Sequence, residues 1–156
     1  KGLMRAEAAS LCQLLTLSPE LVAETFGTSA APSAWHWSSV VSGHDWTRPQ
    51  VRHRVARNRE TQTALRDHLV AASAMYEKSA WFSVSCDEGL TTKMQQRQAA
   101  LLRLSARSVH HLGGWRRRGY GWCGIRVRDD SSLGSASQVT EKQVIQGEID
   151  LLRRVA

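Results

Sequence analysis

The chain has 156 residues and a mass of 17.4 kDa, with 42% apolar residues, which is enough for one globular core and too little for a typical pair of domains. Lys and Arg total 21 against 14 Asp and Glu, so the net charge of +7 and the pI near 10.0 favour a polyanionic partner over a small neutral substrate. No stretch approaches the roughly 18 consecutive apolar residues of a membrane span, so we expect no membrane-spanning segment.

The cysteines Cys12, Cys86 and Cys123 are odd in number and widely spaced. This pattern argues against a disulfide framework and favours buried thiols in a reducing compartment. The sequence begins at Lys1 rather than Met, which fits either a cleaved presequence or a start that is simply absent, and the residues do not separate the two.

The positive charge is concentrated in the middle of the chain. Residues 48–128 hold 16 Lys or Arg and 5 Asp or Glu, a net charge of +11 that leaves −4 for the remainder. Arginine supplies 17 of the 21 cations, and its planar fork can pair with a phosphate or stack on a base. A codon bias toward arginine would raise the total but would not gather the charge in one region.

In the first third of the chain, the leucines and alanines of residues 3–16 predict an amphipathic helix. A short second helix is predicted from Ser18-Pro19-Glu20, with Gly27 as its stop. Residues 28–47 show no sustained period and are interpreted as a connecting segment, in which Trp35, Trp37 and Trp46 serve as packing anchors rather than as a base-stacking platform.

In the basic middle, apolar residues recur at helical intervals and predict a helix from Pro49 to Lys78, with a break near Asn58 left open. Residues 79–92 are expected to form a loop that packs down Trp81 and Phe82. Residues 93–112 give the strongest helix prediction, ended by Gly113-Gly114.

Beyond that helix, residues 115–128 predict a basic tail or a short extended piece, and residues 129–137 a polar linker. Thr140 and Gln143 then form a capping-box pattern before a last amphipathic helix. The predicted fold is all-α: a helical hairpin core with additional N-terminal helices and a C-terminal amphipathic helix. We expect an N-terminal extension over 1–47, an RNA-binding helical core over 48–118, and a C-terminal extension with a docking helix over 119–156.

Motifs of catalytic chemistry are weak in this sequence. The stretch Gly119 to Gly124 satisfies G-x-G-x-x-G, but no predicted strand precedes it and no helix follows, so a dinucleotide site is rejected. The six histidines lack metal-ligand spacing, and no serine lies in a nucleophile elbow. We therefore expect no enzyme activity, no cofactor and no metal.

Two arginine clusters remain. The first precedes or enters the first central predicted helix and consists of Arg48, Arg52, Arg54, Arg57 and Arg59. The second runs along and beyond the next predicted helix and consists of Arg97, Arg103, Arg107 and Arg116 to Arg118. If those helices pack antiparallel, the clusters could lie at the same end and contact a folded RNA. Double-stranded RNA is recognised mainly by shape and backbone, which suits cations on rigid elements. The alternative is a solvated basic surface.

Two stretches resemble the bacterial-type small-subunit ribosomal protein fifteen family. Glu60 to Leu65 resembles the Glu-x-Gln-x-Ala-Leu start of that family's second helix. Residues 101–118, with Leu-Leu-Arg-Leu followed by basic residues, resemble its third helix. Ala56-Arg57-Asn58 stands where the family has Thr-Gly-Ser, Met94-Gln95-Gln96-Arg97 where it has Asp-His-His-Ser, and Gly114 where it has Tyr.

The resemblance implies a helical hairpin that binds small-subunit rRNA at a helical junction, beside neighbouring ribosomal proteins and near the large-subunit interface, where large-subunit rRNA would come within reach. Gln62 falls at an RNA-contacting glutamine of the family and Arg117 at a basic contact. The candidate RNA-binding residues, from the clusters and the resemblance together, are Arg57, Arg59, Gln62, Arg97, Arg103, Arg107, Arg116, Arg117 and Arg118.

The functional hypothesis is a structural constituent of an organellar small ribosomal subunit, located in the mitochondrial matrix, with a plastid as the alternative compartment. A competing hypothesis is a non-catalytic accessory subunit of a large organellar complex such as a respiratory assembly, in which the arginines meet acidic proteins or anionic lipid. A DNA-binding helical module ranks lower, since no recognition-helix motif is found.

Overall fold

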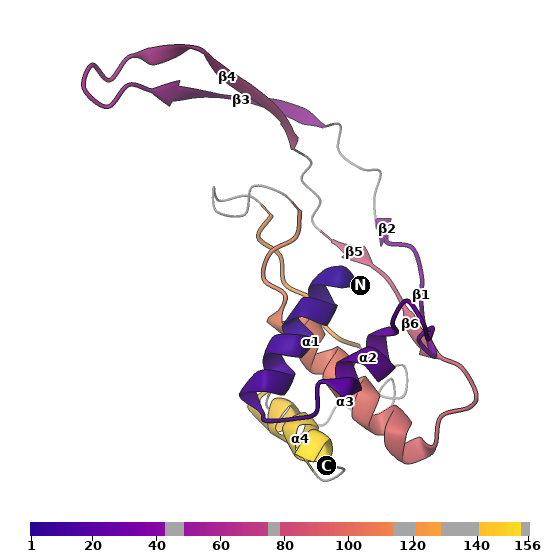
Figure 1. Ribbon diagram of the computed structural model, residues 1–156. Coiled ribbons are helices and arrows are strands. Elements are labelled where there is room, and N and C mark those ends of the chain that lie inside the picture. Colours follow the sequence, from indigo (N-terminus) through magenta and orange to yellow (C-terminus); the bar gives the residue numbers. More distant parts are fainter. Residues whose placement is uncertain (43–48, 75–78, 114–120, 129–140, 154–156) are drawn as a thin grey trace. The chain divides into compact units, whose positions relative to one another are not determined.

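The structure is a computed structural model, and it describes residues 1–42, 49–74, 79–113, 121–128 and 141–153. These residues form four helices and three two-stranded antiparallel sheets (Figure 1). Contacts divide the chain into two compact units, one of residues 1–37 with 84–156 and the other of residues 38–83. We call the first the helical unit and describe each unit by itself.

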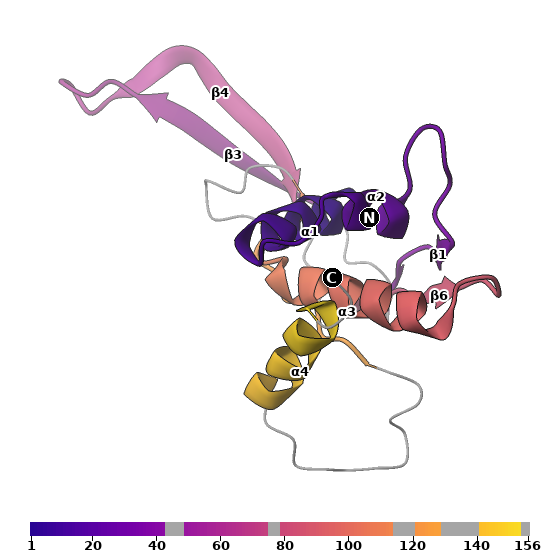
Figure 2. The same ribbon diagram turned by 60° about the horizontal axis from the view of Figure 1, so that its bottom comes forward.

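The helical unit is built around its longest helix, α3. The helices are α1 (Gly2–Leu14), α2 (Glu20–Phe26), α3 (Thr92–Ser108) and α4 (Glu141–Arg153). Helix α3 contacts all three others and lies between the α1–α2 pair and α4 (Figure 2). The apolar core comes from all four helices, and its fully buried large side chains include Phe26, Leu101 and Leu152.

Helix α3 places its apolar stripe in this core and begins at a side-chain cap. The Thr91 hydroxyl accepts a hydrogen bond from the Met94 amide at 3.4 Å, which satisfies one of the unpaired donors of the first turn. The buried amide of Gln98 accepts a 2.8 Å hydrogen bond from the Trp35 indole. Trp35 is therefore a packing anchor, as predicted. Trp37, whose ring centroid lies 6.0 Å from that of Phe26, is a second one.

Helix α2 ends before Gly27 as the sequence predicts, and it begins at Glu20, one residue after the predicted first position Pro19. The Ser18 hydroxyl accepts a hydrogen bond from the Glu20 amide at 3.2 Å. At the other end Gly27 has φ of +78°, and a Cβ added there would lie 2.7 Å from the Ser33 amide nitrogen. Only glycine fits this position without strain.

The other predicted helices of this unit are also confirmed, with one shifted boundary. Helix α1 and helix α4 match their predicted segments, although Thr140 of the capping box lies outside the described residues. Helix α3 ends at Ser108 rather than at Leu112. The reason is a short antiparallel pairing after the helix, in which the Leu112 amide donates to the Gly121 carbonyl at 2.7 Å and the Cys123 amide to the His110 carbonyl at 3.0 Å.

The strands pair in a nested order along the sequence. Strand β1 (Trp35–Trp37) pairs with β6 (Val84–Cys86), β2 (Val41–Ser42) with β5 (Ala80–Trp81), and β3 (Gln50–Arg57) with β4 (Ala64–Ala74). The β3–β4 pair is a long twisted ribbon (Figure 1), which we call the hairpin. None of the described residues of 38–83 is buried, so this unit lacks a core of its own.

The hairpin overturns the prediction of a helix from Pro49 to Lys78 and with it the all-α fold class and the helical hairpin core. The chain is a mixed α and β fold. Val51 and Val55, like Leu65 and Leu69, are four residues apart, and a spacing of four puts two side chains on one face of either a helix or a strand. The alternation of Val51-Arg52-His53-Arg54-Val55 decides for strand.

Two segments for which the sequence predicts only connections contain strands as well. Residues 28–47 include β1 and β2, and residues 79–92 include β5 and β6. Trp81 is 56% exposed rather than packed down, and Trp46 lies outside the described residues. Such short strands carry little local signal because their partners are about 40 to 50 residues away in the chain.

Candidate nucleic-acid interface

The register of the hairpin sorts its side chains onto two faces. Directly paired residues share a face, and successive residues alternate. One face, here the cationic face, carries Gln50, Arg52 and Arg54 opposite Ala74, Ala72 and Val70. The other, here the apolar face, carries Val51, His53 and Val55 opposite Ser73, Ala71 and Leu69. Both faces are accessible, because every one of these side chains is exposed or half-buried.

The cationic face presents its arginines above short neighbours. Arg52 and Arg54 are two positions apart on one strand, which separates their Cα atoms by about 6.6 Å. The residues paired with them are Ala72 and Val70, so the paired positions of this face hold no carboxylate. The Arg52 guanidinium donates to the Gln50 amide oxygen at 3.3 Å. Two guanidinium forks in a row suit successive phosphates of a nucleic-acid backbone.

The tip of the hairpin brings together three of the predicted site residues: Arg57, Arg59 and Gln62. The turn is organised by Asn58. Its backbone amide donates to the Thr63 carbonyl at 2.9 Å, and its side-chain oxygen accepts a hydrogen bond from the Glu60 backbone amide at 2.8 Å. An asparagine oxygen that bonds to backbone amides further along the chain is typical of turns.

Gln62 serves this turn directly. Its φ is +56°, its backbone amide donates to the Asn58 carbonyl at 3.0 Å, and its side-chain amide donates to the Arg59 carbonyl at 2.8 Å. Gln62 therefore helps to shape the tip, while Arg57 and Arg59 are exposed on it. The resemblance places Gln62 at the start of a helix, and that structural expectation is wrong.

Acidic residues at the tip and within β4 offset part of the hairpin's charge. Glu60 is exposed, and Asp67 lies 3.9 Å from the Arg66 guanidinium with both side chains more than 90% exposed. An ion pair this exposed contributes little. The cationic face is thus the more consistently positive surface of the hairpin.

The arginines of α3 are arranged differently. The Arg103 Nε lies 2.7 Å from the Glu148 carboxylate of α4, and an Arg107 guanidinium nitrogen lies 3.5 Å from the same oxygen. Glu148 is 7% exposed, and the two arginines 24% and 21%. Both predicted RNA contacts therefore face a carboxylate of the same unit, which joins α4 to α3.

Arg97 lies earlier on α3 and is half-buried. Burial raises the pKa of the Cys12 thiol on α1, and the positive charge of Arg97 partly offsets that rise. This charge is therefore close to the interior of the helical unit. Arg116, Arg117 and Arg118 lie outside the described residues.

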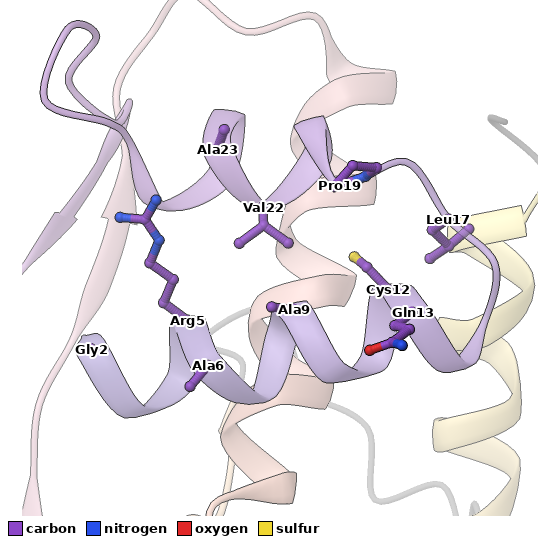
Figure 3. Close-up of a pocket in the computed structure, with 10 residues that line it drawn as sticks. All are labelled: Gly2, Arg5, Ala6, Ala9, Cys12, Gln13, Leu17, Pro19, Val22 and Ala23. Atoms are coloured by element: carbon purple, nitrogen blue, oxygen red, sulfur yellow. The ribbon is translucent and has the colours of Figure 1, made fainter.

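A groove of about 720 Å³ runs between α1 and α2 (Figure 3). Ala6, Ala9 and Cys12 line it from α1, and Val22 and Ala23 from α2. Its ten lining residues include no carboxylate and no imidazole, so they offer no pair of groups for acid–base chemistry. The thiol of Cys12 is buried as predicted, and Cys86 and Cys123 are half-buried.

The described part of the chain contains neither a cluster of metal-ligating side chains nor a membrane-spanning helix. Among the described residues, no group of three or more His, Cys, Asp or Glu side chains could hold a metal ion. Within the same ranges, no helix combines the length and the apolar character that crossing a membrane requires.

Comparison of the chain with family models and with curated proteins finds no match. A functional assignment therefore rests on the chain's own residues. The sequence analysis places Arg52 and Arg54 in its first arginine cluster but does not carry them into the list of candidate RNA contacts. The signal that could have found them is their alternation with Val51, His53 and Val55, which is a strand pattern with its cations on one side.

Proposed function

We propose that the protein is a non-catalytic RNA-binding component of a ribonucleoprotein particle and that the hairpin is its RNA-contacting element. The observation that carries this proposal is the cationic face, where Arg52 and Arg54 project from a ribbon whose directly paired residues on that face bear no negative charge. Phosphate contacts supply most of the sequence-independent affinity for nucleic acid.

The burial pattern supports the same assignment. A two-stranded hairpin is marginally stable alone, and this one has no buried residue among those described in residues 38–83. Such a ribbon becomes stable when it packs against a further element, and the surface of a partner can supply that packing. Residues 50–74 hold five arginines against one Glu and one Asp, which makes a polyanion the complementary surface of the hairpin.

Within this class we propose small-subunit rRNA of a mitochondrial ribosome, with a plastid ribosome as the alternative, and neighbouring ribosomal proteins as further partners. This narrower assignment rests on the resemblance of residues 101–118 to the third helix of the small-subunit ribosomal protein fifteen family. The described part of that stretch includes the Leu-Leu-Arg-Leu run within α3. The ribosomal assignment does not rest on a pair of helices that clamp RNA, since residues 50–74 form strands and a turn.

The test is RNA binding by the full chain at several salt concentrations, with purified small-subunit rRNA as the probe. Replacing Arg52 and Arg54 by Ala should reduce the slope of log affinity against log salt by about 0.7–0.9 for each phosphate that is no longer neutralised. A matched control removes two exposed arginines of the helical unit, Arg5→Ala with Arg153→Ala, and should leave the slope nearly unchanged.

Equal slopes for the two double variants would contradict the assignment of the hairpin. An affinity that does not respond to salt would contradict RNA binding itself. Retention of the native protein in its particle after complete nuclease digestion, together with such a flat response, would favour the accessory-subunit hypothesis.

A further inference from the structure

The apolar face of the hairpin is a second surface that RNA contact on the cationic face leaves uncovered. Val51 is 56% exposed, Val55 45% and Leu69 67%. The six directly paired positions of this face hold no Lys, Arg, Asp or Glu, and His53 and Ser73 are its polar members. His53 lies between Val51 and Val55, so the face is mainly aliphatic with one polar side chain at its centre. Exposed apolar surface of this kind marks protein–protein contacts.

We infer that the apolar face docks against an uncharged, aliphatic surface of a neighbouring protein in the same particle. This inference rests on the proposed function. RNA that contacts Arg52 and Arg54 covers the cationic face, and the apolar face lies on the other side of the same two strands. A phosphate backbone also gains nothing from covering Val51, Val55 and Leu69, which offer neither positive charge nor hydrogen-bond donors.

The size of the face argues against a second copy of this chain as its occupant. The five strand positions from Val51 to Val55 and their partners span about 17 Å by about 10 Å, or roughly 170 Å² for one hairpin. Two such faces together would bury roughly 340 Å², well below the roughly 1,200 Å² of a stable pair. A small contact of this kind becomes effective when RNA binding already holds both partners in one particle and raises their effective concentration.

The charge pattern indicates the chemistry of the partner surface. A strongly charged neighbour would lose hydration against Val55 and Leu69 without gaining a counter-charge among the paired positions. Aliphatic side chains of a neighbouring helix or sheet match the face, because covering them removes apolar surface from water on both partners without stripping water from a charge.

The experiment compares thiol accessibility on the two faces within the native particle. Single variants Val55→Cys and Arg52→Cys are incorporated into the particle, treated with a small maleimide before and after nuclease digestion, and read by site-specific mass spectrometry. The native cysteines are quantified in the same spectra. Leu69→Cys repeats the apolar-face measurement from the opposite strand, and each variant is also measured in the purified free protein.

The inference predicts at least tenfold slower labelling of Val55→Cys in the particle than in the free protein, with the protection retained after nuclease. Arg52→Cys should be protected before nuclease and labelled rapidly afterwards. If both sites lose protection on digestion, RNA alone covers the hairpin and the inference is overturned while the proposed function stands. If Arg52→Cys is already unprotected before digestion, the proposed function fails.

Two other outcomes also overturn the inference. One is unprotected Val55→Cys in the intact particle, which would leave the face open to solvent. The other is a purified protein that sediments as a dimer with Val55→Cys and Leu69→Cys both protected, which would make a second copy the occupant.

Discussion

The helical unit and the hairpin contain the same kinds of side chain and place them in opposite ways. Leu101 of α3 is fully buried, whereas Leu69 of β4 is 67% exposed. Arg103 lies 2.7 Å from a nearly buried carboxylate, whereas the residue paired with Arg52 is Ala72. The helical unit uses its apolar and charged groups to hold itself together, whereas the hairpin exposes aliphatic side chains and sets Arg52 and Arg54 opposite uncharged residues of the paired strand.

This difference shows why a count of arginines is a poor guide to an RNA-binding surface. Residues 48–128 are strongly basic, but the charge of Arg103 and Arg107 is met by Glu148, which lies in the mildly acidic C-terminal part of the chain. The acidic end thus has a structural use. The charge proposed to meet a partner lies where the directly paired strand positions hold no carboxylate.

The largest expected effect tests the contrast in burial. Leu101→Ala should lower the free energy of unfolding by about 2–5 kcal/mol, because it opens a cavity in the core around α3. Leu69→Ala should change it by less than about 0.5 kcal/mol. Urea unfolding followed by circular dichroism measures both, and comparable losses would mean that the hairpin has a packed interior after all.

The contrast in ion pairs comes next. Glu148→Ala should destabilise the helical unit by about 3 kcal/mol, since it leaves Arg103 and Arg107 without their shared carboxylate. Arg66→Ala breaks the exposed pair with Asp67 and should be nearly neutral. The same unfolding measurement compares them. A neutral Glu148→Ala would show that α4 is held by Leu152 and its apolar neighbours alone.

Two variants that remove the same charge should separate stability from binding. Arg103→Ala should cost about 1.5 kcal/mol of stability, the contribution of one charged hydrogen bond, and leave the RNA affinity of the folded protein unchanged. Arg52→Ala should do the reverse. Thermal unfolding gives the stability of each variant, and fluorescence anisotropy gives its affinity for RNA. Weakened RNA binding in Arg103→Ala would mean that the α3 arginines contact RNA after all.

The smallest expected effect on stability comes from the largest change in sequence. Replacing residues 50–74 by a short Gly-Ser linker should alter the unfolding free energy of the helical unit by less than about 0.5 kcal/mol, because no residue of its core lies there. RNA affinity should fall steeply in the same protein. A helical unit that unfolds after this excision would show that the hairpin supports it.

Sequence reasoning succeeds where the decisive signals are local. Ser18, Gly27 and the apolar stripe of α3 act within a few residues of themselves, so the predicted bounds of the four helices lie close to the observed ones. It fails at the hairpin, where a spacing of four between Val51 and Val55 fits two structures. The alternation from Val51 to Val55 favours a strand, but the partner that completes it, residues 69–74 across a turn at Asn58, is not contained in that stretch.

The candidate site is only partly predictable for the same reason. The concentration of arginines is visible in the sequence, but whether an arginine meets a phosphate or a glutamate depends on contacts between distant segments. Arg103 and Glu148 are 45 residues apart, and nothing near either residue indicates the other. Once the strand register is known, the separation of Arg52 from Val51 and Val55 follows directly.

The pairing of Trp37 with Val84 has one more consequence. The segment between them starts and finishes on neighbouring strands, about 5 Å apart. We expect a segment attached in this way to tolerate changes in length. It could also be transplanted onto another pair of adjacent strand ends without moving the helices of the protein that receives it. Its reach toward a partner can thus be altered independently of the scaffold that carries it.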